Sequence, residues 1–258
     1  MDAPALTVRG VTFAAASPVV IVPLTGPDAD GVLAEAARAV AAGADCLEWR
    51  ADHLTDFGDA DATADLIARL RAVAGDLPLL ATVRTSAEGG RWSGSGDDYL
   101  RAIRRLARPG VDLVDVQVGH GRAVEAVTAA HAGGVRVVGS HHTFTHTPAE
   151  DDLVAVLARA ESLGCAVAKV AVMPADALDL LTLLRATARR FADARTPLIT
   201  IAMGPQGALS RVVGPAFGSC ATFATVPDAA GVDRPSAPGQ ATLADVRAAL
   251  EALARVTG

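Results

Sequence analysis

The sequence predicts an α/β protein built as a (β/α)8 barrel, the TIM barrel, with a short N-terminal hairpin that closes the bottom. Eight short apolar segments rich in β-branched residues alternate with alanine-rich segments of helical period. Successive apolar segments are separated by about one strand plus one helix. The total of 258 residues matches a barrel of eight such units.

The expected strands carry few charges, as parallel strands covered by helices require. They are residues 19–24, 46–52, 79–84, 113–118, 136–142, 167–173, 198–203 and 219–226.

Helical segments lie between these strands. Residues 28–44 (DADGVLAEAARAVAAGA) and 150–164 (EDDLVAVLARAESLG) start with acidic residues and repeat apolar residues at steps of three and four. Gly43 and Gly164 near their ends suit C-caps. A doubly wound open sheet is the alternative, but it would prefer a G-x-G-x-x-G turn after the first strand, where the sequence reads TGPDAD.

Residues 5–14 (ALTVRGVTFA) are typical of a small hairpin ahead of the barrel. No linker, repeat or low-complexity tract interrupts the remaining chain. We therefore expect a single domain over residues 1–258.

Composition and charge argue against several classes of protein. A net charge of −6 with scattered basic residues disfavours nucleic acid as a partner. No apolar run reaches the length of a membrane span, and Pro18 and Pro23 interrupt the one segment that faintly resembles a signal peptide. Three widely spaced cysteines without a C-x-x-C pair indicate buried free thiols and a cytoplasmic protein.

Polar and charged side chains gather at the carboxyl ends of the expected strands, where barrels place their active sites. In the second strand, Glu48, Arg50 and Asp52 share a face by the two-residue period. Structural ion pairs such as Glu48–Arg50 are the alternative explanation for any one residue, but not for all. The further strand ends contribute Arg84 and Glu88, His141 and His142, Lys169, Met203 with Arg211, and SAPGQ (236–240).

Lys169 is the only lysine among 23 basic residues of the Lys and Arg type, and it lies within an apolar strand. Its stem could simply cover apolar surface, or its position could be accidental. Burial, however, lowers the pKa of an amine and makes it a nucleophile for a carbonyl carbon. Arginine cannot replace it, because a guanidinium stays protonated. We therefore expect Schiff-base chemistry at Lys169.

A Schiff-base enzyme also needs a proton shuttle, and His142 ends the strand before the lysine strand. The histidine spacing in HHTFTH fits no common zinc motif, so no metal is expected. Arg50, Arg84 and Arg211 indicate a small anionic, oxygen-rich substrate, held by bidentate hydrogen bonds. A phosphate remains an alternative, because the loops after the seventh and eighth strands are rich in glycine, although turn glycines are commoner.

These residues resemble those of type I 3-dehydroquinate dehydratase, the Schiff-base enzyme of the shikimate pathway. The likeness extends from about residue 18 to the C-terminus. It rests on seven motifs in order: LEWRAD, ATVRTSAEGG, GSHHTF, AKVAVMP, TIAMGPQGALSR, FGSCATF and SAPGQ.

The resemblance implies a role for each matching position. Lys169 corresponds to the imine-forming lysine, His142 to the general acid/base, and Glu88 to the carboxylate that orients the histidine. The remaining positions match substrate-binding residues: Glu48, Arg50 and Arg84 for the ring hydroxyls and carbonyl, Arg211 for the carboxylate, Ser236 and Gln240 in a closing loop, and Met203 and Phe223 in the apolar wall.

The resemblance further implies a hydro-lyase that converts 3-dehydroquinate to 3-dehydroshikimate without a cofactor, since the imine is the electron sink. It also implies a homodimer. A class I aldolase-type lyase and a non-catalytic barrel that binds a cyclic carboxylic acid are the alternatives. Two positions depart from the family pattern: Thr143 replaces the usual Asn or Asp, and residues 227–235 lengthen the loop before SAPGQ.

Overall fold

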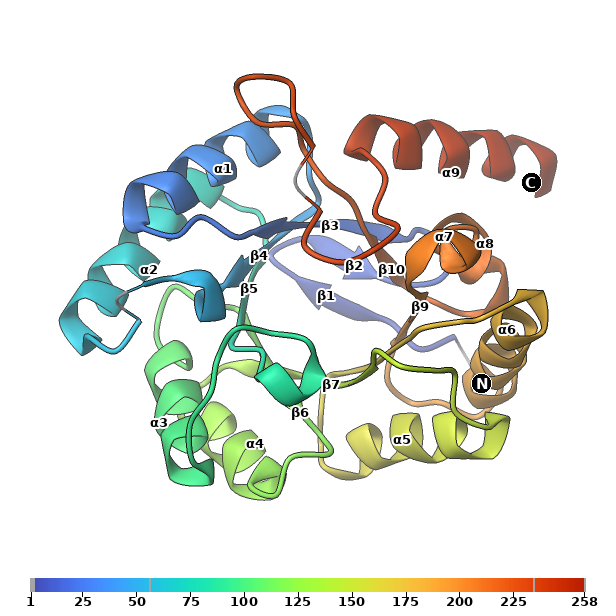
Figure 1. Cartoon of the computed structure of the whole chain (residues 1–258), viewed down its shortest axis with the longest axis horizontal. Coiled ribbons are helices and arrows are strands. Elements are labelled where there is room, and N and C mark those ends of the chain that lie inside the picture. The colour runs from blue at the N-terminus through green and yellow to red at the C-terminus, as the bar shows by residue number, and fades with distance from the viewer. Residues whose placement is uncertain (1–2, 56, 234, 258) are drawn as a thin grey trace.

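The computed structural model describes residues 3–55, 57–233 and 235–257. Its centre is a ring of parallel strands in the order β10-β3-β4-β5-β6-β7-β8-β9 (Figure 1). The strands are β3 (Val19–Leu24), β4 (Cys46–Arg50), β5 (Leu79–Thr82), β6 (Leu113–Gln117), β7 (Arg136–Thr143), β8 (Val167–Val172), β9 (Leu198–Ala202) and β10 (Ala221–Phe223).

The ring closes between β9 and β10. A parallel bridge joins Leu198 to Ser219, and the Cys220 N–H donates to the Leu198 carbonyl at 2.7 Å. The predicted (β/α)8 barrel is therefore confirmed, and the open-sheet alternative is wrong.

Helices surround the barrel on its outer face (Figure 1). They are α1 (Ala29–Ala41), α2 (Ala60–Ala74), α3 (Gly96–Leu106), α4 (Ala123–Ala132), α5 (Glu150–Ser162), α6 (Ala177–Phe191), the short α7 (Gly204–Gly207) and α8 (Ser210–Val213), and α9 (Leu243–Thr257). The side chains of Asp28, Asp59 and Asp176 cap three of them by accepting from first-turn N–H groups. No helix in the described ranges is long and apolar enough to cross a membrane.

Alternation along each strand divides the buried side chains into two sets. Outward-facing residues such as Leu47, Trp49 and Val114 pack against the helices. Inward-facing residues near the start of the strands, such as Ile21 and Leu113, fill the lower half of the barrel. Further along the same inward face the residues become polar, which leaves a charged layer above an apolar floor.

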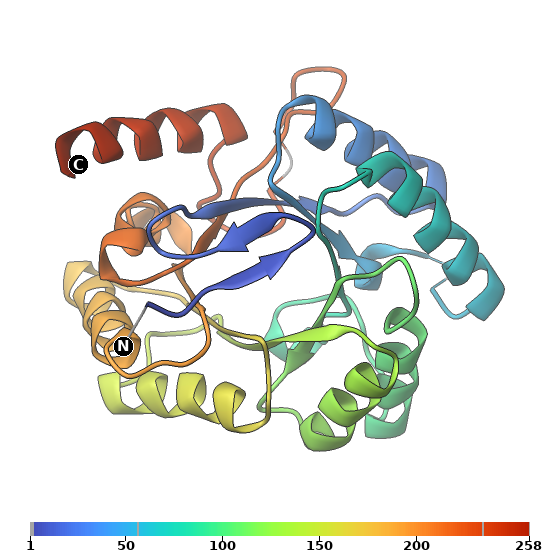
Figure 2. The ribbon, with the colours of Figure 1, turned by 180° about the vertical axis from the view of Figure 1, so that it is seen from behind.

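The N-terminal hairpin, β1 (Leu6–Val8) and β2 (Val11–Phe13), lies across the lower end of the barrel (Figure 2). Val8 and Phe13 are buried against the inward-facing residues at the strand starts, including Val19 and Cys46. Arg9 forms an ion pair with Asp112 at 2.6 Å. The predicted hairpin is thus confirmed, and because it fills the bottom, access to the barrel interior is from the opposite end.

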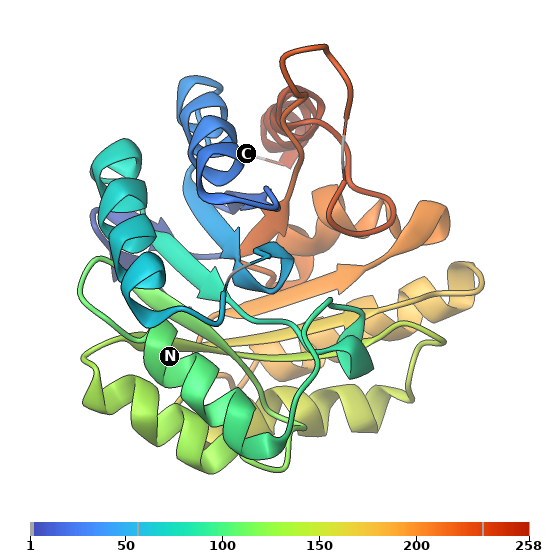
Figure 3. The ribbon, with the colours of Figure 1, turned by 60° about the vertical axis from the view of Figure 1, so that its left-hand side comes forward.

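Several strands end earlier than expected. The second ends at Arg50, because Ala51–His53 form a 3-10 turn, so the expectation that Asp52 continues the strand face is wrong. Residues 83–84 and 224–226 likewise lie beyond the ends of β5 and β10. The segment between β10 and α9 leaves the strand ends as a long loop (Figure 3). The three cysteines are free and buried, as predicted.

Candidate active site

Lys169 lies on the inward face of β8, in the charged layer above the apolar floor, and is 5% exposed. Its Nζ is 3.6 Å from Asp115 Oδ2 and 3.9 Å from Glu48 Oε1. It also lies 4.5 Å from the centre of the Phe223 ring. Burial lowers the pKa of Lys169, and Arg84 and Arg50 act in the same direction, while Glu48 and Asp115 oppose the shift.

Asp115, on the inward face of β6, connects the lysine to Arg84. The Arg84 Nη2 is 2.8 Å from Asp115 Oδ2, and the Ser140 hydroxyl donates to Oδ1 at 2.6 Å. Ser140 in turn accepts from Arg84 Nη1 at 2.9 Å. The Asp115 side chain is completely buried, and burial disfavours its ionisation, but Arg84 and Lys169 outweigh burial and lower its pKa. The carboxylate therefore stays ionised between two buried cations.

Glu88 is held over the end of β7 by a short loop. Its Oε2 accepts from the His142 backbone N–H at 3.0 Å and faces His142 Nδ1 at 2.9 Å. Arg84 Nη1 donates to the same oxygen at 3.1 Å. Burial disfavours the charged form, but the imidazoles of His141 and His142 and the charge of Arg84 outweigh it, so the pKa of Glu88 is lowered.

The loop that carries Glu88 is fixed by its backbone. Gly90 allows the turn, because a Cβ there would lie 2.0 Å from the Arg84 carbonyl oxygen. Gly89 has φ +77°, and a Cβ there would overlap the Phe144 ring. The Gln117 side-chain amide bonds both the N–H and the hydroxyl of Thr85 at 2.9 Å. The close approaches at Gly89 and Gly90 explain the consecutive glycines after Glu88, and the Gln117 amide fixes the start of the loop.

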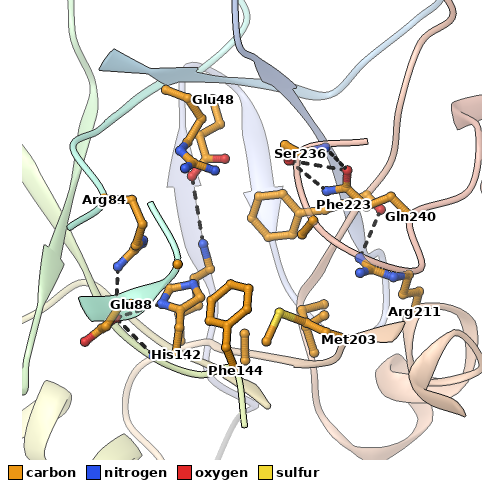
Figure 4. Close-up of a pocket in the computed structure, with 16 residues that line it drawn as sticks. Glu48, Arg84, Glu88, His142, Phe144, Met203, Arg211, Phe223, Ser236 and Gln240 are labelled. Carbon is orange, nitrogen blue, oxygen red and sulfur yellow. Dashed lines mark hydrogen bonds and ion pairs between the residues drawn. The ribbon is translucent and has the colours of Figure 1, made fainter. Parts of the chain in front are cut away.

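His142 faces the pocket from β7, with its ring beside Phe144 (Figure 4). Burial lowers the pKa of His142 to about 3, Arg84 and Lys169 act in the same direction, and Glu88 opposes them. The imidazole is therefore neutral at physiological pH. Because the ionised Glu88 accepts at Nδ1, the ring proton belongs there, and Nε2 is left as the basic nitrogen.

Arg50 and Glu48 line the pocket from β4. The Arg50 guanidinium forms a bidentate pair with Asp52, with both contacts at 2.8 Å. Glu48 accepts a hydrogen bond from Thr82 at 2.8 Å. These contacts hold both side chains in fixed orientations at the pocket.

Arg211 comes from α8 and is 2% exposed. Its Nη2 donates to the Pro238 carbonyl at 3.0 Å and its Nη1 lies 3.5 Å from the Phe223 carbonyl. Nε is buried without a hydrogen-bond partner, and within the described ranges no carboxylate forms an ion pair with this guanidinium. Burial alone lowers the pKa of Arg211 to about 10. A buried cation without a counter-ion is suited to an anionic ligand.

The long loop before α9 contributes Ser236 and Gln240 to the pocket. The Ser236 N–H donates to Gln240 Oε1 at 2.8 Å, and Gln240 Nε2 donates to the Ser236 hydroxyl at 3.1 Å. Met203 and Phe223 form an apolar wall opposite Glu48 and Arg84 (Figure 4). All eleven site residues expected from the sequence line this one pocket.

No group of three or more His, Cys, Asp or Glu side chains in the described part of the chain is arranged to hold a metal ion. The arrangement combines a buried amine, a neutral imidazole oriented by a carboxylate, and a buried guanidinium. These groups suit imine formation with a ketone, followed by proton transfer at the neighbouring carbon.

Comparison with known proteins identifies the family. The family model of type I 3-dehydroquinase matches residues 20–256. The chain belongs to the type I 3-dehydroquinase family.

Relatives agree over nearly the whole chain. The 3-dehydroquinate dehydratase of Klebsiella pneumoniae is 41% identical over 253 residues, which cover 96% of this chain and 98% of that protein. The crystal structure of the enzyme from Geobacillus kaustophilus aligns with a TM-score of 0.93 at 36% identity and covers 99% of both chains. The type I enzyme from Clostridium difficile, solved with covalently modified comenic acid, aligns with a TM-score of 0.91 at 32% identity and covers 99% of this chain and all of that one.

Sequence reasoning missed Asp115, Ser140 and Phe144 in this type I 3-dehydroquinase. Asp115 had a detectable signal, because a lone carboxylate in the apolar run LVDVQV sits on the same face as Gln117. Ser140 and Phe144 lie within the quoted motif GSHHTF, but nothing in their residue types predicted contact with Arg84 or with the pocket.

We predict that Asp115→Asn lowers the free energy of unfolding by about 3 kcal/mol at neutral pH, because it removes one partner of a buried charge pair. Asp151→Asn is the matched control, since Asp151 pairs with Arg189 but is 81% exposed, and it should cost less than about 1 kcal/mol. Urea unfolding measures both values.

The free energy of unfolding should depend on pH, because folding lowers the pKa of Asp115. The stabilisation by the Asp115 carboxylate is complete above its unfolded pKa of about 3.9 and is lost as the pH falls through the lower folded pKa. Equal stability of Asp115→Asn and the wild type at pH 7 would show that the pair does not stabilise the fold.

Proposed function

We propose that this protein is a 3-dehydroquinate dehydratase that removes water from 3-dehydroquinate to give 3-dehydroshikimate, a step of the shikimate pathway, through an imine on Lys169. Relatives at 41% and 36% identity carry the name of this enzyme. The observation that carries the proposed mechanism is the single lysine of the chain, which is buried, lines the pocket and has a lowered pKa.

Arg211 supports a carboxylate as one end of the substrate. Its guanidinium is buried, faces the pocket and has no acidic partner within the described ranges. A substrate carboxylate would neutralise it by charge-assisted hydrogen bonds. Lys169 lines the same pocket beside Glu48 and Asp115, so the ketone of such a substrate would meet the amine while its carboxylate meets Arg211.

The first stage forms the imine. The Lys169 ammonium releases a proton and its free amine adds to the C3 ketone. The carbinolamine hydroxyl then takes up that proton and leaves as water, which gives an iminium bond between Nζ and C3. Glu48 and Asp115 lie within 4 Å of Nζ and stabilise the positive charge of this intermediate. Glu48, Arg50 and Arg84 hold the ring hydroxyls and the carbonyl region, while Met203 and Phe223 form the apolar wall.

The second stage eliminates water. His142 removes a proton from C2 through Nε2, and the electron pair moves into an enamine. The enamine expels the C1 hydroxyl, which takes the proton from His142 and leaves as water. Glu88 stabilises the transient imidazolium through Nδ1. Hydrolysis of the imine then releases the product and Lys169, so the net change is the loss of one water molecule.

Ser236 and Gln240 are proposed to close over the bound substrate. Both belong to the loop that Arg211 contacts through the Pro238 carbonyl. Residues 227–235 lengthen this loop relative to the family pattern, and residue 234 lies outside the described residues.

Two other functions share part of this chemistry. A class I aldolase-type lyase also uses a buried lysine, and a non-catalytic barrel could bind a cyclic carboxylic acid through Arg211. Incubation with 3-dehydroquinate separates them, because only the dehydratase produces the ultraviolet absorbance of a conjugated enone. Correctly folded protein that yields no such absorbance would exclude the proposed function.

We predict that borohydride with 3-dehydroquinate adds one covalent adduct to the wild type, and that Lys169→Ala forms none. Lys169→Arg is the matched variant, because it keeps the positive charge but cannot form an imine. Intact-mass spectrometry measures the adduct, and peptide mapping locates it. Turnover by Lys169→Ala at the wild-type rate would overturn the covalent mechanism.

His142→Ala should still form the imine but should dehydrate the substrate about 10²- to 10⁴-fold more slowly, since this is the usual contribution of a general acid/base. His146→Ala is the control, because His146 is exposed and contacts Thr145 instead of Glu88. Borohydride trapping and steady-state kinetics report the two stages separately. Rapid turnover by His142→Ala would assign the proton transfer to another group.

We also propose that the chain is one domain that acts as a cytoplasmic homodimer without nucleic acid. Three buried free thiols support a reducing compartment. Leu178 and Leu181 on α6 and Leu209 beside α7 are 51–71% exposed, and they offer an apolar face to a second copy. Sedimentation of the full chain should report twice its mass of 26.1 kDa, and a monomeric mass would contradict the dimer.

A further inference from the structure

His141 immediately precedes His142, but the mechanism above does not use it. Because the two residues are adjacent on β7, His142 points into the barrel and His141 points away from it. The His141 side chain is 33% exposed. It occupies space beside Gly119, where a Cβ would lie 3.3 Å from the His141 ring nitrogen Nδ1.

The His141 ring lies next to the same carboxylate that orients His142. Its Nδ1 is 3.4 Å from Glu88 Oε1, whereas His142 Nδ1 is 2.9 Å from Glu88 Oε2. Arg84 and the His142 backbone N–H also donate to Oε2. The two oxygens of Glu88 thus face two different imidazoles. Among the described residues, His141 is the only side chain given a contact with Oε1.

His141 Nδ1 is buried and has no hydrogen-bond partner among the described residues. Glu88 Oε1 lies 3.4 Å from this nitrogen and can accept its proton in a hydrogen bond. Hydrogen bonds in catalytic sites are often long before the substrate binds and shorten in the complex. A small rotation of either side chain would complete this bond.

The Thr143 hydroxyl is placed where it can donate to the outer ring nitrogen of His141. The Thr143 hydroxyl lies 3.5 Å from His141 Nε2. A hydroxyl that donates to Nε2 leaves the ring proton on Nδ1, which then points at Glu88. Thr143 is also one of the two places at which the sequence departs from the family pattern.

We propose that His141 is a positioning residue for the dehydration step: its Nδ1–H holds Glu88 Oε1, so that Oε2 stays on His142 Nδ1 and His142 keeps Nε2 free as the base. Thr143 supports this arrangement by donating to His141 Nε2. The inference rests on the proposed function, because it assigns a partner to the proposed acid/base.

Loss of His141 should affect proton transfer more than substrate binding, because His141 faces away from the pocket. His141→Leu should lower kcat about tenfold, which corresponds to about 1.4 kcal/mol of transition-state stabilisation. KM should change less than twofold. The kinetic isotope effect with substrate deuterated at C2 should increase, because proton abstraction becomes more nearly rate-limiting. Borohydride trapping of the imine should be retained.

Conservative replacements distinguish positioning from packing. The amide nitrogen of Asn can reach the place of an imidazole Nδ1, so His141→Asn should recover kcat to within about threefold of the wild type. Thr143→Val should lower kcat in the same direction, and Thr143→Ser should restore it. His146→Asn is the control, because it alters an exposed histidine of the following loop.

Kinetics of these variants with 3-dehydroquinate, with thermal unfolding to verify the fold, test the proposal. It is overturned if His141→Leu keeps kcat within twofold, if His141→Asn is impaired as strongly as His141→Leu, or if the isotope effect is unchanged. Should His141→Leu fail to fold, the Thr143→Val and Thr143→Ser pair decides by the same criteria. Absence of turnover by the wild type would instead refute the proposed function.

Discussion

The buried carboxylate of Asp115 balances two cations, and the geometry of the pocket depends on this balance. Arg84 lies 2.8 Å and Lys169 3.6 Å from the same oxygen, Oδ2. Without a nearby anion, two positive charges at this depth would be strongly disfavoured. With Asp115 ionised, Arg84 can remain buried where it also contacts Glu88, and Lys169 can remain buried in the charged layer above the apolar floor. The acid/base pair and the nucleophile are therefore coupled through one carboxylate.

Opposing effects act on the pKa of the Lys169 amine. Burial lowers its pKa, but Glu48 and Asp115 oppose that shift. A lysine without these carboxylates would lose its proton easily but would disfavour the cationic imine that has to follow. The two carboxylates therefore serve the charged intermediate more than the resting amine. Arg211 differs, since the described residues supply it with backbone carbonyls and no carboxylate, which suits a site completed by an anion.

The residues that fill the core of the barrel and the residues that line the pocket lie at opposite ends of the barrel axis. The hairpin and the apolar strand starts fill one end, where Phe13 and Ile21 are buried. The polar layer occupies the other half of the same inward face. Glycines in the Glu88 loop then bring that carboxylate over the end of β7, where it meets one imidazole inside the barrel and another outside it. The adjacency of His141 and His142 places one imidazole on each side of that carboxylate.

Much of this protein could be predicted from its sequence alone, because strand and helix periods are local properties. Lys169 was identifiable because burial of an amine can be inferred from its apolar neighbours, and the order of seven motifs indicated the family. The strand end at Arg50, the contacts of Asp115 with Arg84 and Lys169, and the hydrogen bond from Arg211 to the Pro238 carbonyl were decided only by the tertiary structure. Alternation shows which side chains face inward, but barrel closure and loop conformation determine which of them meet across the interior, and those distances arise from residues far apart in the chain.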